Sequence, residues 1–99
     1  MFTPRYFREE LTRLAQTMGC TPIVEMHLHA GATYRLHSIV ETHEGYVVLE
    51  IYPASGRPVE TADRLTVAYE AIADVVFLRP ESDEKARLIG FHAEAGAVR

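Results

Sequence analysis

The sequence lacks the groups from which several common kinds of site are built. It has one cysteine, Cys20, which excludes an internal disulfide and a cysteine-based zinc motif, and it favours a reducing, cytoplasmic location. We expect Cys20 to be a small buried apolar group. No apolar run approaches the length of a membrane-spanning helix, and neither a glycine-rich phosphate loop nor a Ser-His-Asp order is present. We therefore expect no enzyme, no cofactor and no membrane partner.

An excess of positive charge is also missing. Lysine and arginine number 10 against 14 aspartates and glutamates, and the formal net charge is −4. An acidic chain has no general attraction for phosphate backbones, so nucleic-acid binding would need a local basic patch. The 99 residues, 47% of them hydrophobic, fit one globular domain whose small core would gain from a partner subunit.

Residues 3–19 are predicted to form a helix. Thr3 can cap it, and Pro4 suits the first helical position because its missing N–H would be unpaired there. Gly19 allows the left-handed conformation that closes many helices. Apolar residues recur at spacings of three and four along one stripe, formed by Phe7, Leu11, Leu14, Ala15 and Met18.

From Thr21 the hydrophobic period changes to two, which predicts strands within residues 21–79. The turns "HAGAT" and "HEG" separate three strands, Pro53 ends the third, and residues 54–63 form the longest polar loop. Two more strands are predicted near 64–69 and 72–79, with a bend at Glu70-Ala71 and apolar residues on both faces of the last strand. The predicted fold is mainly β with one N-terminal helix, a five-stranded, strongly bent small barrel, because closure removes exposed edges.

The domain is predicted to span residues 1–80, with 81–99 as a C-terminal extension. Ser82 can cap a short helix in "ESDEKARLIGF", and "HAEAGAVR" is expected to be a flexible tail.

Three of the five histidines lie in the first hairpin, "VEMHLHAGATYRLHS". A symmetric turn about Gly31 aligns the apolar residues of the two strands, pairing Leu28 with Tyr34 and Met26 with Leu36. The same register predicts three polar pairs, which are His27 with Arg35, His29 with Thr33 and Glu25 with His37.

His27 and His29 are candidate metal ligands, since a His-x-His pair on one strand face grips metal ions in some barrels. An arginine beside His27 would disfavour a metal ion, and Glu25 beside His37 would favour a protonated imidazole. We therefore favour a polar outer face with one ion pair and assign no metal site. A metal-binding barrel through His27 and His29 is the weaker alternative.

Four features together are similar to one known family. A helix precedes five strands, "VEMHLHAGATYRL" looks like a strand–Gly–strand opening, "HEGYVVLEIY" like the second turn and third strand, and "TVAYEAIADVVF" like the closing pair of strands. Over roughly residues 4–79 the chain thus resembles the Sm/LSm family, which includes the bacterial RNA chaperone Hfq, as a divergent member.

The resemblance implies a homo-oligomeric ring in which the fourth strand of one subunit pairs with the fifth strand of the next. It also implies binding of single-stranded RNA or a nucleotide near the pore. The residues carried over to that site by position are Glu44, Gly45, Tyr46, Tyr69 and Glu70.

The chain departs from the family at this site. Val47 stands near the position of the Sm asparagine, and the final bend has Tyr69-Glu70 instead of the Arg-Gly of Sm proteins or the Lys-His of Hfq. Tyr46 and Tyr69 fit base stacking as well as packing at the rim or between subunits. An acidic side chain repels phosphate, so a scaffold ring that binds proteins and not RNA is the alternative function.

Overall fold

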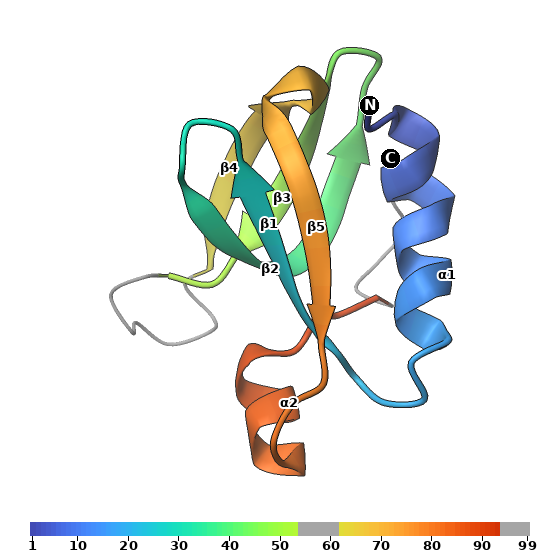
Figure 1. The fold of residues 1–99 in the computed structure, drawn as a ribbon, viewed down its shortest axis with the longest axis vertical. Helices are drawn as coiled ribbons and strands as arrows, with labels where there is room; N and C mark the ends of the chain where they lie inside the picture. Colours follow the sequence, from blue (N-terminus) through green and yellow to red (C-terminus); the bar gives the residue numbers. More distant parts are fainter. Residues whose placement is uncertain (54–61, 94–99) are drawn as a thin grey trace.

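The computed structural model describes residues 1–53 and 62–93, and its elements follow the predicted order (Figure 1). The N-terminal helix consists of a π-helical turn, η1 (Tyr6–Glu10), and α1 (Leu11–Gln16). The strands are β1 (Ile23–Leu28), β2 (Thr33–Thr42), β3 (Tyr46–Ile51), β4 (Asp63–Ala68) and β5 (Ile72–Leu78). A 3-10 turn, η3 (Tyr69–Ala71), separates the last two strands, and a short helix, α2 (Asp83–Ile89), follows them. Most of the predicted loop 54–63, and residues 94–99 of the predicted tail, lie outside the described residues.

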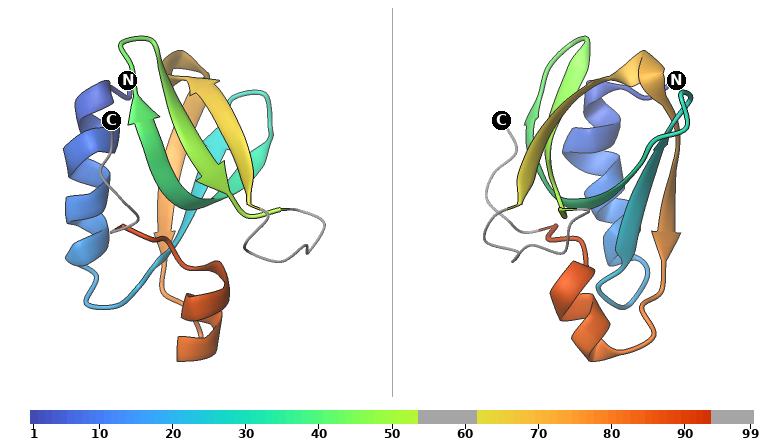
Figure 2. Two further views of the ribbon diagram at one scale, coloured as in Figure 1. Left: turned by 180° about the vertical axis from the view of Figure 1, so that it is seen from behind. Right: turned by 90° about the vertical axis from the view of Figure 1, so that its left-hand side faces the viewer.

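The five strands form one antiparallel sheet in the order β4-β3-β2-β1-β5. The sheet is strongly bent, and the N-terminal helix lies across its open side (Figure 2). The predicted closure into a barrel is wrong, because β4 and β5 do not pair with each other in the part of the chain that the structure describes. The η3 turn directs β5 away from β4 and onto β1, so the two strands become the opposite edges of the sheet.

The N-terminal helix has its predicted boundary signals. The Thr3 hydroxyl accepts a hydrogen bond from the Tyr6 backbone N–H at 3.2 Å, and Gly19 has a φ of +74°. Phe7, Leu11 and Ala15 are buried against both halves of the sheet, as the apolar stripe predicts. None of the helices within the described ranges is long and apolar enough to cross a membrane.

The sheet bends because β2 changes partner along its length. It pairs with β1 only from Thr33 to Arg35 and joins β3 from Leu36 onward, with register shifts on either side of Ser38 and Ile39. Such irregularities bend a strand and increase its twist. Because of the bend, the first residues of β1, Ile23 and Val24, do not pair with β2. The chain that follows α2 lies in the space between these two strands.

We call Gly90–Ala93 the C-terminal strap. The Phe91 N–H donates to the Pro22 carbonyl at 2.9 Å, and the His92 N–H donates to the His37 carbonyl at 2.7 Å, so the strap bridges the diverging strands. The Phe91 ring is only 3% exposed and belongs to the core. His92 and Ala93, which the sequence assigns to a flexible tail, are therefore held against the sheet. The Ser82 cap is confirmed, since its hydroxyl accepts from the Lys85 N–H at 3.2 Å.

The register predicted for the first hairpin is wrong by two residues. The observed pairs are Glu25 with Arg35, Met26 with Tyr34 and His27 with Thr33. The Leu28 N–H donates to the Ala32 carbonyl, while the His29 N–H donates to the Ala71 carbonyl, both at 2.9 Å. Because the His29 backbone bonds to η3, it cannot pair with Thr33. A shift of two residues leaves the faces unchanged, so the predicted apolar face survives.

Two further predictions are corrected near β5. A register shift against His27 and Leu28 leaves Ala73 unpaired, and Ile72, Val75 and Phe77 then all face the core. The strand therefore packs one face against the core, while Val76 and Leu78, the latter 39% exposed, lie on its outer face. Cys20 is exposed and not buried, because it follows the turn at Gly19 on the surface.

The strap is expected to be an integral part of the fold. Phe91→Ala should lower the free energy of unfolding by about 3 kcal/mol, since it removes buried surface and leaves a cavity. Leu88→Ala, at the 54% exposed Leu88 of α2, is the matched control and should change stability by less than about 0.5 kcal/mol. Urea unfolding followed by circular dichroism measures both. Equal effects of the two variants would show that the strap adds nothing to the core.

Candidate functional site

Three chain connections meet at the end of the sheet opposite α2 (Figure 1). The Tyr69 N–H of η3 donates to the Gly45 carbonyl of the β2–β3 turn at 3.3 Å, and the Ala71 carbonyl of η3 accepts from the His29 N–H of the β1–β2 turn. We call this end the rim and define it as residues 29–31, 43–46 and 69–71. Its η3 turn thus connects two turns that are distant in sequence.

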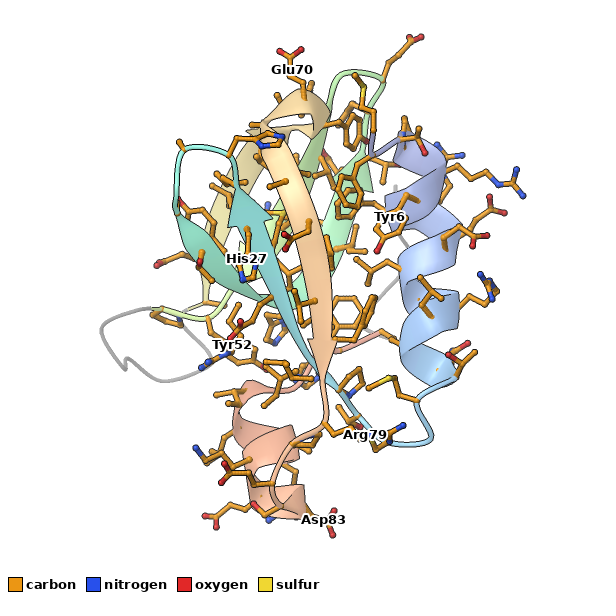
Figure 3. The ribbon with its side chains drawn as sticks, viewed as in Figure 1. Tyr6, His27, Tyr52, Glu70, Arg79 and Asp83 are labelled. Carbon is orange, nitrogen blue, oxygen red and sulfur yellow. The ribbon has the colours of Figure 1, made fainter. Side chains whose placement is uncertain are left out.

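All five residues that the family resemblance suggests lie at the rim. Glu44, Gly45, Tyr46 and Glu70 are exposed. Figure 3 shows Glu70 pointing away from the body of the molecule. Tyr46 pairs with Ala68 in the β3–β4 ladder, which places the second turn directly beside η3.

Tyr69 differs from the other four because it is only 4% exposed. Its ring stacks on Phe7 with a centroid distance of 5.8 Å and an interplanar angle of 26°. Its hydroxyl donates to the His43 carbonyl at 2.7 Å, which ties the β2–β3 turn to η3. Burial raises the pKa of Tyr69, so the hydroxyl remains a donor at neutral pH. Tyr69 therefore supports the rim from within and has no face free for a base.

His43 is a further aromatic residue at the rim, and the sequence pattern did not indicate it as a site residue. The His43 ring stacks on Tyr46 with a centroid distance of 4.5 Å and an interplanar angle of 19°, and both side chains are exposed. His43 Nε2 lies 3.1 Å from Glu41 Oε2, which fixes the plane of the imidazole. The available signal was a histidine and a tyrosine flanking the Glu-Gly turn. The two flat rings form a platform of the kind on which nucleobases stack.

The charges around this platform are mainly acidic. Glu44 and Glu70 are exposed at the rim, and Glu41 contacts His43. One helix cation, Arg8, reaches the end of β2 beside the rim, where its Nε donates to Thr42 Oγ1 at 3.3 Å. The rim thus combines aromatic stacking surface with a field that disfavours phosphate.

The neighbouring basic side chains of the helix are paired with carboxylates. Arg5 bonds Glu9 at 3.1 Å, and Arg13 bonds Glu10 at 2.6 Å. Exposed pairs of this kind contribute little to stability, but they reduce the positive field along the helix. Arg5 and Arg13 therefore add little attraction for an anion, and Arg8 is the helix cation that contacts the end of β2 beside the rim.

The predicted surroundings of His27 are wrong as a result of the shifted register. Arg35 pairs with Glu25 at 3.3 Å and not with His27, and the expected pair of Glu25 with His37 is not formed. His27 instead lies between carboxylates, with Nδ1 at 2.6 Å from Asp74 Oδ1 and Nε2 at 3.6 Å from Glu25 Oε1. Figure 3 places His27 on β1, away from Glu70 and the rim.

The two candidate metal ligands do not come together. Both ring nitrogens of His27 face carboxylate oxygens, while His29 is exposed in the β1–β2 turn. Within residues 1–53 and 62–93, no group of three or more His, Cys, Asp or Glu side chains is arranged to hold a metal ion.

Comparison of the chain with family models, curated proteins and solved structures finds no match in any of the three. The sheet edges and the rim are therefore the features of this chain from which a function can be inferred.

The contact between Tyr69 and His43 is expected to hold the rim in place. Tyr69→Phe removes one hydrogen bond and should lower the free energy of unfolding by about 1 kcal/mol, because the His43 carbonyl loses its partner. Tyr46→Phe removes the same hydroxyl from an exposed ring and should change it by less than about 0.5 kcal/mol. Thermal unfolding of both variants measures the difference. A Tyr69→Phe variant as stable as the parent would contradict the assigned role.

Proposed function

We propose that this chain is an Sm-like subunit of a homo-oligomeric ring that binds single-stranded RNA or a nucleotide at its rim. The observation that carries the proposal is that β4 and β5 are the two outermost strands of the sheet in the part of the chain that the structure describes. These are the two strands that the Sm resemblance joins between neighbouring subunits. The N-terminal helix and the bent five-stranded sheet support the same assignment.

Edge strands expose rows of backbone donors and acceptors, and proteins usually cover or blunt them. The β5 edge ends in the exposed Leu78, and the charged residues of the two strands, Asp63, Arg64 and Asp74, include both signs. Pairing of β4 with β5 of another copy is heterologous, so it repeats from subunit to subunit until a ring closes. In such a ring, each subunit contributes one His43–Tyr46 platform.

Base stacking on that platform is the contact that favours RNA. Stacking tolerates many sequences because every base has a π-face. The glutamates of the rim oppose the phosphates, so the affinity should depend on salt less steeply than that of a basic RNA-binding protein. A protein–protein scaffold ring remains the second candidate function, favoured by Glu44, Glu70 and the net charge of −4.

Self-association is expected to depend on the β5 edge. Leu78→Lys places a charge on that edge and should shift the protein towards monomer, because edge lysines oppose strand pairing. Leu88→Lys changes a similarly exposed leucine on α2 and should leave the assembly intact. Sedimentation velocity measures the molecular mass of each. A parent protein that sediments as a monomer at micromolar concentration would exclude the ring.

Binding of RNA is expected to depend on the stacked pair. His43→Ala and Tyr46→Ala should each weaken binding of labelled oligo-uridine or oligo-adenosine by about tenfold, the loss of roughly one stacking contact. Leu88→Ala, at an exposed residue of α2 at the opposite end of the sheet, is the control and should bind normally. Fluorescence anisotropy at low salt measures the affinities. A parent protein that forms the ring and binds neither strand would favour the scaffold function.

A further inference from the structure

The strap is fastened to β2 by two histidines that face each other. The rings of His37 and His92 stack with a centroid distance of 4.4 Å and an interplanar angle of 18°. The His92 N–H donates to the His37 carbonyl, so the same two residues are also joined through the backbone. At this separation two neutral imidazoles pack well, whereas two imidazolium ions repel each other.

Polar and charged groups of several elements surround His37 and His92. On β2, His37 Nδ1 lies 2.9 Å from Ser38 Oγ, and the charge of Arg35 acts on the neighbouring Tyr52. On β3, Glu50 favours a charged His37, but it also faces Arg64 of β4 at 3.8 Å. On α2, Arg87 lines the same open groove as His92.

Tyr52 also holds the strap, through a hydroxyl group that does not change charge in the pH range of histidine. Its hydroxyl donates to the Gly90 carbonyl at 2.5 Å, and its ring lies 5.3 Å from His37. Figure 3 shows it close to α2. Burial raises the pKa of Tyr52 to about 12, so the hydroxyl keeps its proton over the whole pH range in which histidine changes charge. The stacked pair is therefore the pH-dependent part of the attachment.

We propose that the C-terminal strap is a pH-sensitive latch, which lies on the sheet while His37 and His92 are neutral and detaches when both become protonated. Detachment withdraws Phe91 from the core and opens the place where β1 and β2 diverge. A groove of about 530 Å³ lies between α1 and α2. Detachment also removes Phe91, His92 and Ala93 from the lining of this groove. The device is independent of RNA binding at the rim.

The direction of the pH effect follows from the folded state. Burial first, and then His92, lower the pKa of His37 below its ordinary value of 6.5, and Glu50 only partly offsets them. The detached state therefore binds more protons than the attached state in mild acid. The attachment is complete above the ordinary histidine pKa and weakens as the pH falls through it.

Native-state hydrogen exchange of the full-length protein tests the latch. Protection factors for the Phe91 and His92 amides, corrected for intrinsic rates, should fall at least about tenfold between about pH 7.5 and about pH 5. Amides of β3, which lies between two strands, should keep their protection. Unchanged protection of the strap amides, or a parallel loss in β3, would overturn the proposal.

Variants of His92 separate the charge from the stacking. His92→Phe keeps a flat ring without a titrating group, and its strap amides should lose less protection between the two pH values than those of the parent. His92→Gln provides the same test if the phenylalanine perturbs the fold. A pH-dependent loss in these variants as large as in the parent would contradict the role of the histidine pair.

Discussion

The architecture depends on one constraint, the division of β2 between two partners. Only three residue pairs join β2 to β1 before β2 turns to β3, and the register shifts within β2 produce the bend. The bend folds the two halves of the sheet around one core, which Phe7, Leu11 and Ala15 of the helix complete. It also separates β1 from β2 at one end, where Phe91 fills the space.

The functional features follow from the same bend. Because the two halves of the sheet do not close on each other, β4 and β5 remain as edges that a second copy can cover. At the rim, η3 joins the two turns through backbone hydrogen bonds, and Tyr69 packs beneath them. The exposed stack of His43 on Tyr46 is thus supported by buried contacts, which keeps its orientation fixed without using the exposed faces of either ring.

Local signals in the sequence predicted the elements well, because caps, turn glycines and hydrophobic period act over a few residues. Thr3, Gly19, Gly31 and Ser82 behave as expected. The errors concern contacts between distant segments, which no local pattern encodes. The hairpin register depends on the bond from His29 to Ala71, and the burial of Phe91 depends on a gap opened by β2. The rim could be predicted only by resemblance, and His43 was missed because its partner Tyr46 becomes visible as a stack only in three dimensions.

Cross-linking between the two edges tests the central claim most directly. Thr66→Cys on β4 and Leu78→Cys on β5, made separately and together in a Cys20→Ser background, are treated with a short bis-maleimide. If β4 pairs with β5 of the next copy, the double variant should form cross-linked species larger than a dimer. Neither single variant should cross-link, because β4 then contacts only β5 of the next copy. Dimers formed by a single variant alone, or no species larger than a dimer from the double variant, would contradict heterologous pairing of the edges.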